Sequence, residues 1–387
     1  MGILLGVVVG LIVLVLLVVV HELGHAIVAK RNGVKVEEFG VGFPPKAWSK
    51  KVKSSLLGKN VEYSLNWLPL GGFVRLQGEH DAADKKGDYG AANYWAKTKI
   101  LLAGVAMNWL VAVILFTALA FVGMPKLLPN QFAMGDTREV VLQPLTIVDV
   151  IEGSPAEKVG LKKGDVLVSI NDKTPVITAE LNNATTQLRG QTVAVTYKRK
   201  EIKKTINLTL NKEAGNTGYM GVKTFGRSEL KSGWSAPVVG VGITVQLTWE
   251  TLKGLGQVIV DTVVGAGQKL FSFDSAIQHE GDKKLSKVSQ SVSGPVGILG
   301  VIFPSFVEAG LKPLILLSAV ISLSLAVMNF LPIPALDGGR WFTMTVYKLR
   351  KKELTKEREE KIQAIGFIVL MSLIILITVV DIGKFFK

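Results

Sequence analysis

Residues 3–29 read ILLGVVVGLIVLVLLVVVHELGHAIVA, an apolar stretch that closes with two histidines four positions apart. Residues 3–20 carry no charged side chain. Because about 20 mostly apolar residues cross the hydrocarbon core of a bilayer, this stretch is long enough to form a transmembrane helix. It lacks the basic start and the small-residue cleavage site of a secretory signal peptide. We therefore expect a retained span, with the histidines near its C-terminal end.

The composition of the whole chain indicates a membrane protein. Apolar residues make up 48% of the 387 residues, and charged residues make up 20% with a net charge of +14. A nucleic-acid binder would place its basic residues on a polar surface, and a disordered chain would lack the apolar residues, so both classes are excluded. The chain has no cysteine, which excludes disulfides, thiolate catalysis and cysteine-bound metals.

Three further apolar stretches are long enough to span a bilayer, at residues 100–122, 313–331 and 362–380. The predicted fold class is an α-helical multi-pass membrane protein with four transmembrane helices. The corresponding segments are 1–33, 100–123, 313–340 and 362–382. A fifth apolar stretch contains Glu250, Lys253 and Asp261, and each charge would cost about 2.5–3.5 kcal/mol at the bilayer centre. We therefore expect residues 236–266 to form an amphipathic helix on the outer membrane surface.

The basic residues predict the orientation of the spans. Residues 30–99 carry thirteen Lys and Arg against seven acidic residues, and residues 340–361 carry eight against four. Four spans place these two loops on the same side, which the positive-inside rule assigns to the cytoplasm. The N-terminus, the C-terminus and residues 124–312 are then expected outside the cytoplasm.

Two segments outside the spans show strand patterns. Residues 34–99 contain the runs 61–65 and 71–76, and they predict a cytoplasmic, membrane-associated β-hairpin region in which the polar residues 79–93 are mobile. Residues 136–222 predict a β-rich soluble module, with several short strands between residues 140 and 151 and one helix from Ala179 to Leu188.

The pentapeptide His21-Glu22-Leu23-Gly24-His25 indicates a metal site. A helical spacing of four places both imidazoles on one face, where they can share one zinc ion. Glu22 can then take a proton from the attacking water. The alternative is a pair of histidines at the lipid–water interface with Glu22 directed toward water. Polar residues on a membrane-spanning helix are energetically costly and usually have a functional role, so we favour the metal site.

A catalytic zinc usually has three protein ligands, and Asp337 is the best third candidate. It follows the sequence NFLPIPAL at residues 329–336, in which two prolines end the third span. The first and third spans run in the same direction, so both motifs arrive at the same membrane face. By itself Asp337 would be interpreted as an ordinary turn residue before Gly338 and Gly339. Because the chain also has the histidine pair, we favour Asp337 as a metal ligand.

These motifs together resemble the site-2 protease family of intramembrane zinc metalloproteases. Residues 151–167 resemble a PDZ domain, and the combination resembles the bacterial regulator-of-sigma-E protease type, here with a single PDZ domain. Other matching segments are 39–44, 69–74, 103–108 and 293–298, so the resemblance covers essentially the whole chain. Val105 departs from the pattern, because relatives commonly have proline there.

The resemblance implies Zn²⁺ held by His21, His25 and Asp337, with Glu22 as the general base. It also implies that Asn329, Gly71 and Gly72 lie against the substrate. Asn329 could equally satisfy backbone groups freed by the prolines, and the Gly71-Gly72 region could be a purely structural hairpin. The expected partners are single-pass membrane proteins, the lipid bilayer and a peptide ligand of the PDZ domain.

The predicted function is regulated intramembrane proteolysis, with cleavage of transmembrane segments in anti-sigma-factor-like or signal-peptide-like substrates. The alternative is a non-catalytic membrane adaptor that binds peptides through its PDZ domain. Glu22 argues against the adaptor, because a purely structural metal site needs no base.

Overall fold

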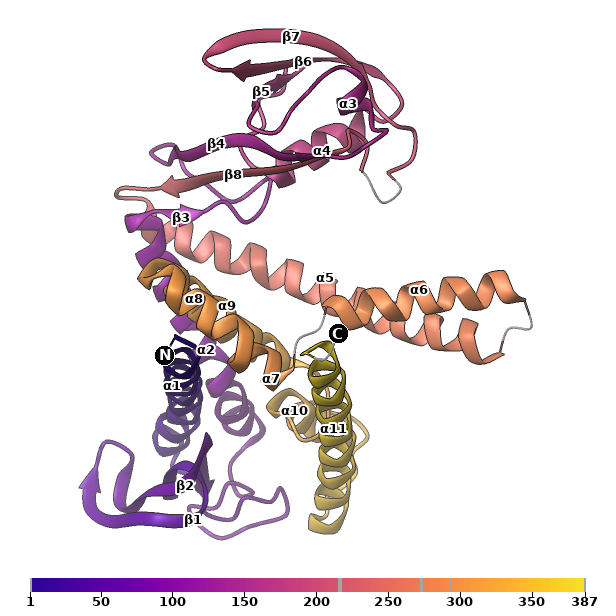
Figure 1. Ribbon diagram of the computed structural model, residues 1–387. Coiled ribbons are helices and arrows are strands. Elements are labelled where there is room, and N and C mark those ends of the chain that lie inside the picture. Colours follow the sequence, from indigo (N-terminus) through magenta and orange to yellow (C-terminus); the bar gives the residue numbers. More distant parts are fainter. Residues whose placement is uncertain (1, 215–217, 272–273, 292–293, 386–387) are drawn as a thin grey trace. The chain divides into compact units, whose positions relative to one another are not determined.

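The computed structural model describes residues 2–214, 218–271, 274–291 and 294–385, and the chain forms two compact units. The first unit contains residues 1–115 and 244–387, and the second contains residues 116–243. Figure 1 shows the helices and strands of both units.

Four helices in the described residues are long and apolar enough to cross a membrane. They are α1 (Gly2–Arg31), α2 (Tyr94–Val122), α9 (Leu311–Phe330) and α11 (Lys356–Phe385). At 1.5 Å per residue, the 20 residues of α9 extend about 30 Å, which matches the hydrocarbon core of a bilayer. Each stretch predicted to span the membrane overlaps one of these helices, so the helical membrane-protein class agrees with the structure.

A two-stranded antiparallel sheet connects α1 to α2. Its strands are β1 (Val36–Ser55) and β2 (Gly58–Leu76). Both strands fold back on themselves: Phe39 of β1 lies opposite both Tyr63 and Val74, and Tyr63 of β2 lies opposite both Phe39 and Lys50. Residues 72–76 consequently pair with residues 36–41 on one side and leave their other side toward α1.

The segment after β2 differs from its prediction. Residues 79–93 were expected to be polar and mobile, but Tyr89 is only 2% exposed and belongs to a hydrophobic cluster with Val36, Val61 and Met344. The ring of Tyr89 inserts into this hydrophobic cluster. The polar composition of the segment does not reveal that one of its side chains is buried.

Shorter helices complete the first unit. These are α6 (Ser275–Ser291), α7 (Pro295–Gly297), the π-helical turn η1 (Ile298–Ile302), α8 (Phe303–Ala309) and α10 (Asp337–Leu349). Helix α8 packs closely against α1: a Cβ atom on Gly6 would lie 2.3 Å from the Cα of Pro304. The expected amphipathic helix falls within α5 (Ala236–Phe271), which is 36 residues long and has its first residues, up to Ile243, in the second unit.

The second unit is built on a six-stranded sheet in the order β3-β8-β4-β5-β6-β7. Its elements are β3 (Met124–Pro125), β4 (Arg138–Val150), α3 (Pro155–Lys158), β5 (Val166–Ile170), α4 (Thr178–Gln187), β6 (Thr192–Arg199), β7 (Ile202–Thr209) and β8 (Val222–Lys231). Its core contains Ile147, Ile170, Val195 and Leu208, each fully buried. The expectation of several short strands between residues 140 and 151 is wrong, because β4 is one continuous strand paired along its length with β8.

Candidate metal centre and active site

Two imidazoles meet on one face of α1. His21 and His25 are each 7% exposed, and their Nε2 atoms lie 3.1 Å apart. The Nδ1–H of His25 donates to the carbonyl oxygen of Ile100 on α2 at 2.7 Å. A neutral imidazole carries one proton, so this bond leaves the Nε2 of His25 as a free lone pair directed at His21.

Asp337 joins the two histidines from the first residue of α10. Its Oδ2 lies 3.0 Å from the Nε2 of His21 and 3.3 Å from the Nε2 of His25. The turn before it is tight, because a Cβ on Gly339 would lie 1.9 Å from the carbonyl oxygen of Ile333. Only glycine fits this position, so Gly339 allows Asp337 to reach the histidines.

The three side chains fit a zinc ion. Within the described residues, His21, His25 and Asp337 form a cluster whose donor atoms all lie within 4.8 Å of one another. Tetrahedral zinc with ligands at about 2.1 Å separates neighbouring donors by about 3.4 Å, close to the observed 3.0–3.3 Å. Two imidazole nitrogens and one carboxylate oxygen are a donor set that zinc accepts, and they leave a fourth position open for water or substrate.

Glu22 lies between the histidine pair and the strand edge formed by residues 72–76. The backbone N–H of Val74 donates to its Oε2 at 3.1 Å. Backbone groups alternate sides along a strand, so Gly72 presents its N–H and carbonyl on the same side as Val74. A Cβ on Gly72 would lie 3.8 Å from the Cγ of Glu22, which confirms how close the two residues are.

The other residues predicted to contact substrate lie in different settings. Gly71 has φ +91°, a left-handed conformation that favours glycine, and it forms the bend that starts the 72–76 edge. Asn329 lies half-buried in the last turn of α9, eight residues before Asp337. Among the described residues no hydrogen bond joins Asn329 to the three metal-binding candidates, so its role stays a prediction.

Helix α2 supplies groups whose part in the site the sequence did not reveal. A Cβ on Gly104 would lie 2.3 Å from the Nε2 of His25 and 2.6 Å from the Nε2 of His21. One turn later, the Nδ2 of Asn108 lies 3.4 Å from the Nδ1 of His21. The segment 103–108 matched a family pattern, and that was the only signal that could have indicated these two residues.

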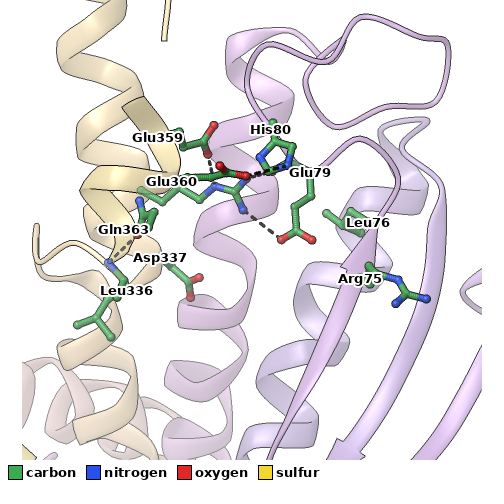
Figure 2. A pocket seen from close by; sticks show the side chains of 11 residues that line it. Arg75, Leu76, Glu79, His80, Leu336, Asp337, Glu359, Glu360 and Gln363 are labelled. Atoms are coloured by element: carbon green, nitrogen blue, oxygen red, sulfur yellow. Dashed lines mark hydrogen bonds and ion pairs between the residues drawn. The ribbon is translucent and has the colours of Figure 1, made fainter. Parts of the chain in front are cut away.

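A cavity of about 550 Å³ opens beside Asp337. Figure 2 shows the lining side chains, which come from the end of β2, the segment after it, the turn before α10, the first turn of α10 and the start of α11. Arg340 ties these segments together through Glu359 at 2.9 Å, Glu79 at 3.2 Å and the ring of Tyr89 at 4.8 Å. Burial raises the pKa of Tyr89, so its ring stays neutral. Asp337 is the one metal-binding candidate among the residues that line this cavity.

Comparisons with known proteins agree with this geometry. The family model described as peptidase family M50 matches residues 9–373. A "Putative zinc metalloprotease" of Clostridium perfringens is 30% identical over 370 residues, which cover 95% of each chain. The zinc metalloprotease RasP of Geobacillus kaustophilus is 26% identical over 96% of each chain, and the regulator of sigma-W protease RasP of Bacillus subtilis is 25% identical over 96% of each chain.

One solved structure, the PDZ domain of an SdrC-like protein of Listeria monocytogenes, covers 22% of this chain and 90% of its own at 19% identity, with a TM-score of 0.20. That score is too low to support an argument. The family match extends over nearly the whole chain, however, and includes α1, α2, α9 and α10, which carry the histidine pair, Asn108, Asn329 and Asp337. The chain therefore belongs to peptidase family M50 and is a zinc metalloprotease.

Proposed function

We propose that this protein is an intramembrane endopeptidase in which His21, His25 and Asp337 bind Zn²⁺ and Glu22 is the general base. The observation that supports this best is the buried cluster of three donor atoms at 3.0–3.3 Å, beside a carboxylate on a helix long enough to span a bilayer. The substrates would be single-pass membrane proteins of the anti-sigma-factor or signal-peptide type.

The proposed chemistry uses one carboxylate twice. Zn²⁺, when bound, supplies a Lewis acid that polarises the scissile carbonyl and makes water a stronger acid. Glu22 accepts the proton of the attacking water and returns it to the leaving amine. The hydrogen bond from Val74 keeps Glu22 at the strand edge, where a substrate backbone would lie.

The edge formed by residues 72–76 would bind the substrate as an added strand. A transmembrane helix must unwind before its peptide bond can be attacked, and the freed backbone groups then need partners inside the membrane. On the side facing Glu22, Gly72 offers its N–H and carbonyl and Val74 offers its carbonyl, so strand addition would satisfy the substrate and align it with the base. Gly71 shapes the bend before this edge, and Asn329 would donate to the substrate backbone from the end of α9.

The proposed orientation follows the loop charges. Residues 30–99 and 340–361 would be cytoplasmic, which places the active site toward the cytoplasmic side and both termini outside. Residues 136–222 would then be an extracytoplasmic PDZ domain. A cavity of about 240 Å³ between α4 and residues 218–222 is the proposed place for a peptide ligand.

Cleavage of a tagged single-span substrate tests the proposal. We expect the full chain to cleave it and the variant Glu22→Gln to retain zinc but lose cleavage. Glu353→Gln changes an exposed carboxylate of the same type and serves as the control. Equal cleavage by Glu22→Gln and wild type would refute the assignment of the base. Substrate binding without cleavage by the wild type would instead support the adaptor.

Metal analysis tests the ligands separately. Purified His21→Ala and Asp337→Ala should each lose zinc, because two remaining donors bind the ion weakly. An unchanged zinc content in Asp337→Ala would show that another group is the third ligand.

A further inference from the structure

The second ring nitrogen of His21 needs a partner. Its Nε2 faces Asp337 at 3.0 Å and His25 at 3.1 Å, so its Nδ1 lies on the opposite side of the ring, toward α2. An imidazole that binds a metal through Nε2 carries its proton on Nδ1 and donates it to a nearby acceptor. For His25 this acceptor is the carbonyl oxygen of Ile100.

Asn108 is the polar side chain that meets the Nδ1 of His21. It is 1% exposed, and its Nδ2 lies 3.4 Å from that nitrogen. The amide oxygen of the same side chain is buried and has no hydrogen-bond partner among the described residues. The amide oxygen and nitrogen have nearly the same shape, so a half-turn of the amide brings the unpartnered oxygen to the Nδ1 of His21.

We propose that Asn108 is a positioning residue for the metal centre: its Oδ1 accepts the Nδ1–H of His21 and fixes the tautomer and ring orientation in which Nε2 binds Zn²⁺. Both imidazoles are then held from α2, one by a backbone carbonyl and one by a side-chain amide. This inference rests on the proposed role of His21 as a ligand, and it adds a residue to which no role was assigned.

The surroundings of Asn108 hold it in place. Its backbone carbonyl accepts a hydrogen bond from the hydroxyl of Ser322 on α9 at 2.8 Å, and Ser322 is fully buried. Helix α9 leads into the turn that carries Asp337. Ser322 therefore provides a matched control, since Ser322→Ala removes a contact of Asn108 without removing the acceptor for His21.

Zinc affinity provides a measure that does not depend on activity. Removing such an acceptor typically weakens metal binding 10–100-fold. We expect a loss of this size in Asn108→Leu, which keeps the branched shape of the side chain and removes the acceptor. Asn108→Asp keeps an acceptor oxygen, so its affinity should equal or exceed that of wild type, and Ser322→Ala should stay within about threefold of wild type.

The experiment titrates the full-length detergent-purified protein with zinc against a chromophoric chelator. The visible absorption spectrum of the Co²⁺-substituted protein reports the ligand geometry in parallel, and it should change in Asn108→Leu and be restored in Asn108→Asp. Asn108→Ala replaces Asn108→Leu if the larger variant fails to fold, with the same expected loss.

Two results would overturn the inference. One is zinc affinity in Asn108→Leu, or in Asn108→Ala where it replaces that variant, within about threefold of wild type. The other is a loss in Asn108→Asp as large as in the apolar variant, which would indicate a packing role. His21→Ala separates this inference from the proposed function. Unchanged zinc binding in His21→Ala would refute His21 as a ligand. Loss of zinc binding in His21→Ala, together with unchanged zinc affinity in Asn108→Leu, would refute the role of Asn108 alone.

Discussion

Gly104 gives the sharpest prediction, because helix propensity and the metal site demand opposite residues at this position. In the interior of α2, replacing glycine by alanine should stabilise the helix by about 1 kcal/mol. The new methyl group, however, would lie 2.3 Å from the Nε2 of His25 and 2.6 Å from the Nε2 of His21. Gly104→Ala therefore sets a gain in helix stability against a direct clash with two proposed ligands.

The clash sets the size of the effect. Non-bonded heavy atoms rest at about 3.5 Å, so each of the two imidazoles must move by about 1 Å to admit the methyl group. Metal sites tolerate shifts of about 0.2 Å in ligand distance. We expect zinc affinity to fall at least 100-fold, while overpacking costs about 1–3 kcal/mol of folding stability and offsets the helix gain.

The assay compares Gly104→Ala with Gly254→Ala. A Cβ on Gly254 in α5 meets nothing within 4 Å, so this control makes the same chemical change without a clash. Zinc content by elemental analysis, thermal unfolding and substrate cleavage are measured for both. Gly254→Ala should match wild type in zinc content and cleavage. If Gly104→Ala keeps full zinc content and normal cleavage, the close approach of α2 to the histidines is wrong.

Three further predictions concern groups that are not proposed to bind the metal. Arg340→Met leaves Glu359 buried and unpaired, which should cost about 3–5 kcal/mol of unfolding free energy, and the double variant Arg340→Met/Glu359→Leu should recover most of it in denaturant titrations. Burial opposes ionisation of Asp165, but its hydrogen bonds with Arg199 and a backbone N–H hold its pKa below the usual value. The ionised Asp165 therefore contributes its full stabilisation above the unfolded pKa of about 3.9, and this contribution is lost as the pH falls through the lower folded pKa. Asp165→Asn should remove this pH dependence of stability, as measured by hydrogen exchange of both proteins at matched pH. Asp381 accepts two backbone N–H groups at the start of α7, so Asp381→Ala should raise hydrogen exchange over residues 294–303, and unchanged exchange there would contradict the proposed contact.

Much of the fold could be predicted because its rules are local. The thickness of the hydrocarbon core fixes the length of a span. Length and composition are therefore enough to recognise residues 3–29 and the three other apolar stretches as candidate spans. The spacing of His21 and His25 matches one helical turn, which brings their rings together without help from other segments.

The predictions that failed depend on partners distant in sequence. Tyr89 lies in a polar segment, and its burial depends on Val36, Val61 and Met344. The continuity of β4 depends on β8, which pairs with it from about 80 residues further along the chain. Neither the burial of Tyr89 nor the continuity of β4 produces a periodic hydrophobic pattern in the local sequence.

The sequence by itself determined the membrane class, the histidine pair and the candidate base, because each follows from hydrophobic length or helical period within a few residues. Only the tertiary structure brought Asp337 to within 3.0 Å of His21, across 316 positions of the chain. It also placed Val74 on Glu22 and Asn108 beside His21. These contacts join separate helices and strands, and packing between elements fixes such distances, whereas sequence spacing does not.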